Sequence, residues 1–381
     1  MIKICHITTG HNTNDIRIFQ KECVSLAKKD EYKVYFVGPG KSRSERNVEI
    51  IGVGTYPSSR FERVTSHAKK IVKAALELKA DVYHFHDPEL LLYIRKLKSS
   101  GAIIIFDSHE DYKQQILTRA YLPKSVRKTV AGIYKLIEDN ACKMIDAAII
   151  PCPVNGRHIF MGRVKSCAYI NNYPLLIKNS VNSEFSVKKD KIVCYTGSIS
   201  EARGVGNLIK ACYEVGAKLI LAGPFDSEQY KADLENRKEY ECVDYRGYCS
   251  KEEIIEIYNQ TKVGANILLN VGQYKNAQNL STKVYEYMMM GIPFVINNSE
   301  FNVEFLRNYQ CGIAVNPSNI QEISNAIEKL LNNDNTCKRM GDIGRAIVRE
   351  KYNWDVEEKK LYKLYEMLLQ ENKKDKLNVQ S

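Results

Sequence analysis

The sequence predicts an α/β fold with two Rossmann-like domains, each built around a doubly wound parallel sheet. The chain of 381 residues is long enough for two domains of roughly 150–200 residues each. Short β-rich runs alternate with segments of helical periodicity, and this alternation begins again near residue 191. Because ligands of open parallel sheets bind outside the carboxyl ends of the strands, we expect the two domains to face each other across a cleft.

The first domain is expected to span residues 1–172. Six β-rich runs in it predict strands, at residues 3–7, 33–37, 48–53, 81–85, 102–106 and 146–150. Between two of these runs, residues 67–78 place apolar side chains at the spacing of an amphipathic helix. The pattern is typical of strand and helix in alternation.

The second domain is expected to span residues 191–352. Its strands are predicted at residues 191–196, 217–222, 243–247, 263–268, 293–296 and 313–315. Residues 173–190 are polar, aperiodic and broken by Pro174, which indicates an interdomain linker. Residues 353–371 predict an amphipathic helix that packs back toward the first domain, and residues 372–381 are expected to be a disordered tail.

Composition excludes several classes of protein. With 44% hydrophobic and 27% charged residues, the chain can bury a sizeable core, which excludes disorder and fibrous repeats. The longest uncharged apolar stretch, residues 287–296, is about half of what a membrane-spanning helix needs, and we expect no signal peptide. Eleven cysteines without a Cys-x-x-Cys pair indicate reduced thiols in a cytoplasm, with neither zinc nor a disulfide framework.

The net charge of +11 lies entirely in the first half of the chain. Residues 1–172 contain 28 of the 56 basic residues but only 17 of the 45 acidic ones, and the remainder is balanced. Such asymmetry favours an anionic partner, either nucleic acid or an anionic membrane surface. The alternative is a solvated basic face that serves solubility.

The first group of polar residues follows the first predicted strand. Gly10 and His11 stand in a turn, and Asp15 and Arg17 open a helix. Backbone N–H groups exposed at such a turn suit an anion or sugar hydroxyls. Alternatively, Asp15 and Arg17 pair with each other as a loop clasp.

Histidines follow two further strands of the first domain. His84 and His86 alternate along one strand and should point the same way, so one of them can be a buried histidine satisfied by a backbone partner. His109 and Glu110 follow the next strand, and His109 is the better active-site candidate. The spacing matches no zinc signature, so we expect no metal here.

Two segments of the second domain suit a phosphorylated ligand. Gly197 and Ser198 allow close approach of the backbone, and Arg203 can contact phosphate oxygens. In the later segment, polar residues precede a short helix whose amino end would offer free N–H groups. Its candidate residues are Gln278, Leu280, Ser281, Thr282, Lys283 and Glu286. Glu286 can accept bonds from two vicinal hydroxyls, or it is a surface charge.

In this order, the segments resemble the retaining glycosyltransferases of family 4, which have the two-domain GT-B fold, particularly bacterial capsule and surface-polysaccharide enzymes. The resemblance covers nearly the whole chain. It rests on His11-x-x-x-Asp15-x-Arg17-Ile18-Phe19-x-Lys21-Glu22, His84-x-His86-Asp87, Asp107-x-His109-Glu110 and, most specifically, Lys283-Val284-Tyr285-Glu286-Tyr287-Met288.

The resemblance implies transfer of a sugar from a nucleotide-sugar, most often a UDP-sugar, with retention of configuration, no cofactor and no metal at the diphosphate. Transfer should therefore survive EDTA. Catalytic roles fall to His109, Arg203 and Lys283, and donor binding to Gly10, Gly197, Ser198, Gln278, Leu280, Ser281, Thr282 and Glu286. Acceptor or cleft positions fall to His11, Asp15, Arg17, His86 and Glu110. The family usually has glutamate at position 278 and an arginine near position 198, so this chain departs from the pattern at both.

The resemblance also suggests a glycan acceptor carried on a polyprenyl diphosphate. Residues 119–135 mix five cations with amphipathic apolar residues and can lie on anionic lipid. We therefore expect a cytoplasmic enzyme that is peripheral at the inner face of the plasma membrane and binds no nucleic acid. The alternatives are a UDP-sugar 2-epimerase of similar fold and a catalytically inactive sugar-nucleotide-binding partner.

Overall fold

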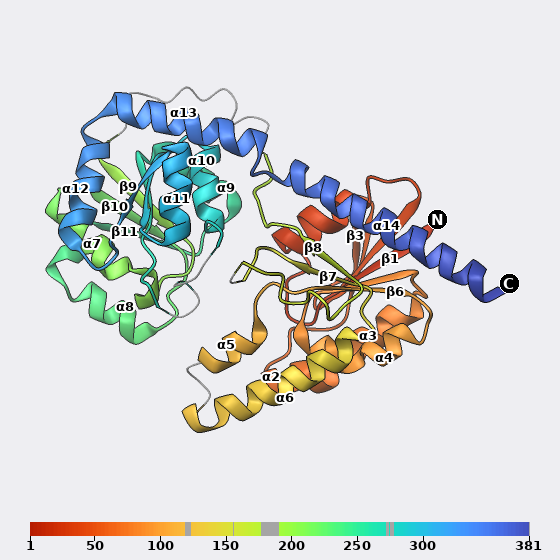
Figure 1. Ribbon diagram of the computed structural model, residues 1–381. Coiled ribbons are helices and arrows are strands. Elements are labelled where there is room, and N and C mark those ends of the chain that lie inside the picture. Colours follow the sequence, from red (N-terminus) through yellow and green to blue (C-terminus); the bar gives the residue numbers. More distant parts are fainter. Residues whose placement is uncertain (119–122, 155, 177–189, 272–273, 275–277, 381) are drawn as a thin grey trace. The chain divides into compact units, whose positions relative to one another are not determined.

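The computed structural model describes residues 1–118, 123–154, 156–176, 190–271, 274 and 278–380 (Figure 1). The chain forms two compact units. Unit 1 comprises Met1–Asn172 together with Trp354–Ser381, and unit 2 comprises Tyr173–Asn353. Each unit is an α/β domain with its own sheet and its own core.

Unit 1 contains a sheet of eight strands in the order β3-β4-β2-β1-β5-β6-β7-β8. Its strands are β1 (Ile2–Ile7), β2 (Tyr32–Gly38), β3 (Arg43–Glu45), β4 (Val48–Gly52), β5 (Val82–Phe85), β6 (Ile103–Asp107), β7 (Ala147–Ile150) and β8 (Ser166–Tyr169). All neighbours pair in parallel except β3, which runs antiparallel to β4. The six expected strands form, and the sequence missed only the short edge strands β3 and β8.

The helical segments of unit 1 connect these strands. They are η1 (Ile16–Cys23), α1 (Val24–Leu26), α2 (Arg60–Glu62), η2 (Arg63–His67), α3 (Ala68–Glu77), η3 (Pro88–Tyr93), α4 (Ile94–Lys98), α5 (Tyr112–Thr118), α6 (Lys124–Cys142) and α14 (Trp354–Gln380). The apolar spacing of α3 buries one stripe, Ala68, Ile71, Val72 and Ala75, as an amphipathic helix requires.

Side chains of β1 and β5 alternate between two faces of the sheet. Cys5 and Ile7 on β1, like Tyr83 and Phe85 on β5, join the hydrophobic core of one face. The residues between them are histidines, and the parallel register pairs His6 with His84. Because successive strand residues point to opposite faces, these histidines lie on the face away from that core.

The carboxyl-terminal helix α14 belongs to unit 1. The Nε1–H of Trp354 donates to Ser25 Oγ (2.8 Å), and the hydroxyl of Tyr362 donates to the Ser25 carbonyl (2.8 Å). Residues 372–380 are helical, whereas the composition predicts a disordered tail from residue 372. This tail has neither proline nor glycine and contains good helix formers such as lysine, so nothing in it ends the helix.

Unit 2 contains a fully parallel sheet in the order β11-β10-β9-β12-β13-β14. Its strands are β9 (Ile192–Thr196), β10 (Lys218–Ala222), β11 (Val243–Gly247), β12 (Val263–Asn266), β13 (Phe294–Asn297) and β14 (Gly312–Val315). Its helical segments are η4 (Glu201–Arg203), α7 (Val205–Glu214), α8 (Glu228–Glu235), η5 (Lys238–Cys242), α9 (Lys251–Gln260), α10 (Thr282–Met289), α11 (Glu300–Tyr309), α12 (Ile320–Leu331) and α13 (Asp334–Glu350).

Both faces of the unit 2 sheet are covered. Along β9, Val193 and Tyr195 join one hydrophobic cluster, while Ile192 and Cys194 join another. This two-sided burial explains the nearly continuous apolar run that predicted the strand. Of the expected linker, residues 177–189 lie outside the described residues, and Tyr173 already packs against Tyr285 with ring centroids 4.9 Å apart.

The strand order reverses direction at one point in each sheet. In unit 1 the chain builds outward from β1 to β2 and β4 on one side and from β5 onward on the other. In unit 2 the same reversal lies between β9 and β12. Ligands of open α/β sheets bind outside the carboxyl ends of the strands at such a point, so the loops after β1, β5, β9 and β12 are the places to search.

Candidate functional site

The loop after β1 is anchored by acidic residues that follow β5. Asp87 accepts from the Thr8 hydroxyl (2.6 Å) and from the Thr9 amide (2.7 Å). Arg63 donates to Asp87 (3.0 Å) and to Glu89. The guanidinium of Arg63 lies directly against Gly10, so a side chain at this position would have to displace it from Asp87 and Glu89.

His11, Asp15 and His109 meet at the carboxyl edge of the unit 1 sheet. His11 Nδ1 lies 3.5 Å from Asp15, and the His11 and His109 rings are 5.0 Å apart in an edge-to-face arrangement. Burial opposes charge on His11, but Asp15 and Asp87 raise its pKa overall. Burial also opposes ionisation of Asp15, yet its bonds with His11 and the Ile18 amide lower its pKa to about 2. Because both histidines are partly exposed, they can touch a ligand.

Two residues expected at acceptor or cleft positions are buried instead. The Arg17 side chain is 5% exposed and forms a bidentate ion pair with Asp107 (2.7 and 2.9 Å), so it does not form the alternative clasp with Asp15. His86 is fully buried, with Nδ1 3.3 Å from Asp107. Neither can contact an acceptor, because each is buried and contacts Asp107. Both side chains instead support the loops at the carboxyl edge of the sheet.

The other predictions for these loops have mixed outcomes. His84 and His86 do face the same way, but both are buried and their partners are side chains rather than backbone. His109 Nε2 lies 3.2 Å from Asp107, with the side chain 20% exposed. Glu110 is exposed in the same loop. The sequence pattern does not identify His6 and Glu22 as partners of these histidines, because they lie on other elements, β1 and η1, far away along the chain.

Two groups in the described part of unit 1 have the spacing of metal ligands. One comprises His6, Glu22, His84 and His86, all buried. The other comprises His86, Asp107 and His109. Asp107 is already bidentate to Arg17, which leaves the first group as the better ligand set.

The loop after β9 in unit 2 encloses a buried lysine. Lys283 is 8% exposed, and its Nζ lies 3.6 Å from the centroid of the Tyr195 ring. Within the described residues its ammonium has no hydrogen-bond partner. A side-chain carbon at Gly197 would lie 3.2 Å from this Nζ, and Gly197 has a φ of +112°, so only glycine fits the loop above the amine.

The electrostatics of Lys283 favour an anion. Burial, and then the positive charge of Arg203, lower the pKa of Lys283 well below its usual value. Arg203 itself is half-buried at the end of η4, next to Gly204, which has a φ of +69°. A side chain at Gly204 would collide with the carbonyl of Ile267, so this loop packs closely on the loop after β12. The two cations repel each other until a negative group lies between them.

Glu286 on α10 is held by a residue that the sequence analysis did not single out. The Tyr258 hydroxyl donates to Glu286 (2.6 Å) and lies 2.8 Å from the hydroxyl of Thr196. Glu286 is half-buried and is therefore not the free surface charge of the alternative interpretation. Tyr258 looks like a core tyrosine in the sequence, because its ring is buried in α9.

The remaining candidates surround the start of α10. Ser281 is the N-cap residue but makes no side-chain capping bond, and its hydroxyl accepts from the Asn266 amide (3.1 Å) instead. Thr282 is exposed, Gln278 and Ser198 are half-buried, and Leu280 is buried with only its backbone available. The positive end of this eight-residue helix thus lies in the same unit as the two cations.

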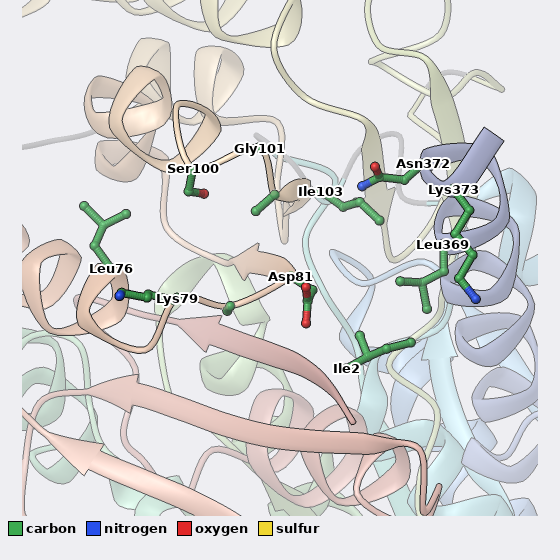
Figure 2. A pocket seen from close by; sticks show the side chains of 12 residues that line it. Ile2, Leu76, Lys79, Asp81, Ser100, Gly101, Ile103, Leu369, Asn372 and Lys373 are labelled. Atoms are coloured by element: carbon green, nitrogen blue, oxygen red, sulfur yellow. The ribbon is translucent and has the colours of Figure 1, made fainter. Parts of the chain in front are cut away.

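A cavity of about 370 Å³ lies elsewhere in unit 1 (Figure 2). It is lined by Ile2, Asp81 and Ile103 at the amino ends of the strands, with Leu369 and Lys373 from α14 opposite them. None of the site residues discussed above lines it. It is therefore distinct from the carboxyl edge where the polar loops converge.

Two general properties concern the chain as a whole. All eleven cysteines are free thiols. Among the described residues, no helix combines the length and the apolar character needed to cross a bilayer.

Comparisons with known proteins agree with this architecture. Residues 177–347 match the family of glycosyl transferases group 1. An uncharacterized glycosyltransferase of Methanocaldococcus jannaschii is 27% identical over 194 residues, which cover 48% of this chain and 46% of that relative. The matched region thus spans about half the length of this curated relative.

Solved structures resemble the chain over nearly its whole length. Sucrose-phosphate synthase from Thermosynechococcus elongatus superposes with a TM-score of 0.74 at 14% identity, covering 97% of this chain and 99% of that one. HepE of Anabaena, solved with UDP and glucose, gives a TM-score of 0.69 at 13% identity, covering 96% and 100%. The chain therefore shares the two-domain α/β fold of these structures, which confirms the two predicted parallel-sheet domains. Residues 177–347, which match glycosyl transferases group 1, lie within unit 2.

Proposed function

We propose that the protein is a retaining glycosyltransferase that moves a sugar from a nucleotide-sugar, with UDP as the nucleotide, to a glycan acceptor. The observation that carries this proposal is the buried ammonium of Lys283, which lies without a hydrogen-bond partner among the described residues, beneath Gly197. A buried cation without a partner is costly unless a ligand supplies the missing charge. The family match of unit 2 and the UDP complex of HepE support a nucleoside diphosphate as that ligand.

In this proposal Lys283 and Arg203 assist departure of the diphosphate. Negative charge grows on the leaving group as the bond to the anomeric carbon breaks. Cations and helix N–H groups that are already in place stabilise that charge without reorganisation, which lowers the barrier. We assign the start of α10, residues 280–282, to the phosphates, together with Gly197, Ser198 and Gln278 around them.

Glu286 is proposed to bind the ribose of the donor. A half-buried carboxylate can accept from both hydroxyls of a vicinal pair. The bond from Tyr258 holds this carboxylate against the end of β9. Tyr258 is therefore a positioning residue that acts through Glu286.

In unit 1 we assign the acceptor and the transferred sugar to the exposed edge made by Gly10, His11, Asp15, His109 and Glu110. His109 and His11 present ring nitrogens there, while the buried Arg17–Asp107 pair fixes the loop beneath them. In a retaining transfer of this kind, the acceptor attacks from the face that the leaving group departs from. His109 then positions the donor sugar near its reacting centre.

We further propose that α6 places unit 1 on an anionic membrane, where a polyprenyl-diphosphate-linked acceptor resides. Exposed apolar residues recur along α6 at Val126, Val130, Ile133 and Leu136, a spacing that forms one stripe. Lys124 and Lys128 are exposed on the same helix. Of the expected basic segment, residues 119–122 lie outside the described residues, and Lys135 is engaged by Asp139 (2.6 Å). This surface suits attachment at the inner face of a plasma membrane in surface polysaccharide synthesis.

The test is to incubate the protein with a panel of nucleotide-sugars, with and without lipid-linked acceptor. We expect sugar transfer that depends on the acceptor and is lost in Lys283→Met. The matched control is Lys262→Met, which removes another buried lysine of unit 2. Lys262 lies just before β12 and is paired with Asp334. Epimerised donor, or binding without turnover, would overturn the proposal in favour of an epimerase or an inactive binding protein.

A further inference from the structure

Four side chains converge in the interior of unit 1, beneath the candidate site. They are His6 from β1, Glu22 from η1, His84 from β5 and His86 just after β5. All four are fully buried. One ligand atom from each lies within 4.8 Å of all the others. Neither the donor site nor the proposed acceptor edge uses these atoms.

The four atoms lie close to one another, and two of them, His6 Nδ1 and His86 Nε2, are joined by a hydrogen bond. Glu22 Oε2 lies 3.9 Å from His6 Nδ1, 4.0 Å from His84 Nε2 and 3.9 Å from His86 Nε2. His6 Nδ1 and His86 Nε2 are 3.0 Å apart. In a tetrahedral site with metal–ligand bonds of 2.0–2.1 Å, the ligand atoms lie about 3.3 Å apart. These four separations lie between 3.0 and 4.0 Å and the other two are within 4.8 Å, while the His84 and His86 ring planes are only 24° apart, so the imidazoles would have to turn for all three to face an ion.

Glu22 lacks the partners that a buried carboxyl needs. Both of its oxygens, and His84 Nε2, have no hydrogen-bond partner among the described residues. Arg17 lies 3.2 Å from Glu22, but its guanidinium is bidentate to Asp107. Two buried carboxyl groups thus share one guanidinium, so an ionised Glu22 would have no cation of its own. Such a charge is stable only if a cation or a proton neutralises it.

The outward-facing atoms of the histidines are held as metal-binding histidines usually are. His86 Nδ1 lies 3.3 Å from Asp107, and His84 Nδ1 lies 2.9 Å from the Tyr365 hydroxyl. His6 Nε2 lies 3.5 Å from the same hydroxyl. A carboxylate or hydroxyl on the second ring nitrogen fixes the tautomer and turns the other nitrogen toward the ion.

We propose that His6, Glu22, His84 and His86 form a structural binding site for a divalent transition-metal ion, with zinc the best fit. Three imidazoles and one carboxylate suit zinc, and four protein ligands in a closed interior are typical of structural rather than catalytic sites. The ion would tie β1, η1 and β5 together and, through Tyr365, would hold α14 on unit 1. The spacing of His84 and His86 alone did not suggest this site, because His6 and Glu22 reach it from other elements.

The competing arrangement is a proton on Glu22. Burial, and then the charge of Asp107, raise the pKa of Glu22 well above its usual value, so a neutral carboxyl is the alternative without metal. The two arrangements differ in a measurable way. A metal site binds a stoichiometric ion and depends on it for stability, whereas a protonated glutamate responds to neither metal nor chelator.

The first experiment uses the full chain purified without metal-affinity resin. We expect elemental analysis to find about one zinc ion per chain. A strong chelator should lower the thermal unfolding midpoint, added zinc should restore it, and cobalt(II) in place of zinc should give the visible absorption of a tetrahedral site. Metal well below stoichiometry, together with a midpoint that neither chelator nor added zinc, iron(II), manganese(II) or cobalt(II) changes, would overturn the proposal.

Variants assign the ion to these residues. Glu22→Gln and His84→Gln should lose stoichiometric zinc, and Tyr365→Phe should retain it with about 10-fold weaker affinity. The matched control is His158→Gln, which removes a buried histidine of unit 1 that lies near a backbone carbonyl and outside the cluster. If Glu22→Gln and His84→Gln bind zinc as the parent does, the site is misassigned. Should these variants fail to fold, the cobalt spectrum of the parent and the affinity of Tyr365→Phe decide the question.

Discussion

We expect Lys283 to lower the stability of the free protein and to strengthen the binding of the nucleotide. In the free protein its ammonium is buried and, among the described residues, has no hydrogen-bond partner, which is unfavourable. Lys283→Met keeps most of the length of the side chain and removes the charge. We expect this variant to unfold at a higher temperature than the parent without nucleotide, by roughly 1–3 kcal/mol of unfolding free energy.

The same variant should bind UDP more weakly, because the diphosphate loses a cation. Thermal unfolding and calorimetric titration with UDP measure the two effects side by side. Lys262→Met should instead lower stability and leave UDP binding unchanged, since Lys262 is paired with Asp334 and its loss removes a partner. A Lys283→Met protein that is less stable than the parent and binds UDP equally well would contradict this account.

A second prediction concerns protons. Burial and Arg203 lower the pKa of Lys283 in the free protein, and a bound diphosphate would raise it again. Since the bound state has the higher pKa, UDP binding takes up protons between the two pKa values, and affinity falls as the pH rises through that range. Calorimetry over a series of pH values, each in two buffers of different ionisation enthalpy, measures this uptake. Equal heats in both buffers, or uptake that persists in Lys283→Met, would argue against it.

Glu286 should affect binding more than turnover. Glu286→Gln preserves the shape but removes charge-assisted bonds to the ribose, at a cost of roughly 1.5–3 kcal/mol in both ground and transition states. Arg203→Ala should instead lose turnover at saturating donor, because charge on the diphosphate grows as the bond breaks. UDP titration and saturated rates separate the two. Unchanged UDP binding in Glu286→Gln would remove this residue from the nucleotide site.

At the scale of single elements, α6 offers the most direct test. Replacing Lys124, Arg127 and Lys128 by glutamate should release the protein from anionic liposomes, because each cation near such a surface contributes about 1 kcal/mol at low salt. The control replaces three exposed lysines of unit 2, Lys251, Lys329 and Lys338, with the same change of charge. Co-sedimentation that survives the α6 changes but not the control changes would place the membrane contact elsewhere.

The elements that the sequence predicted are those with strong periodicity. The buried strands β9 and β10 show as apolar runs, and α3 shows as an amphipathic stripe. The edge strand β3 consists of Arg43, Ser44 and Glu45, which have no apolar pattern and pair only because β4 presents an open edge. Such a strand is created by its neighbour, so the local sequence does not reveal it.

Only part of the candidate site could be predicted, again because some residues are placed by partners that are distant in the sequence. Side chains that end up at strand ends, such as His109 and Asp15, can be found from the alternation of strands and polar loops. Arg17 and His86 were expected at a ligand, yet both are buried against Asp107. A polar residue near a strand end can bind a ligand or pair with another protein side chain. The sequence alone does not tell which, because such a protein partner is distant along the chain.

On the scale of the whole molecule, unit 1 depends on a helix from the far end of the chain. α14 buries Trp354, Leu361, Leu364, Tyr365 and Leu368. Each such side chain contributes roughly 1.5–3 kcal/mol when buried, so deleting residues 354–381 should unfold unit 1. Unit 2 should continue to bind UDP, because its core contains none of these residues.

Hydrogen exchange of the backbone amides and a UDP titration test this prediction together. In the truncated chain we expect β1 and β5 to lose protection, while the affinity for UDP stays within about 3-fold of the parent. Protection of β1 and β5 that matches the parent would show that α14 is dispensable for the fold of unit 1.

The order of the elements along the chain also has a consequence for synthesis on the ribosome. Unit 2 is one continuous segment that separates the first 172 residues from α14. At a translation rate of about 5–20 residues per second, the nascent unit 1 waits on the order of ten seconds or more for its last helix. During that interval Ser25 lacks Trp354 and the buried histidines lack Tyr365. The amino-terminal part of the protein is thus the first to be made and the last to be completed.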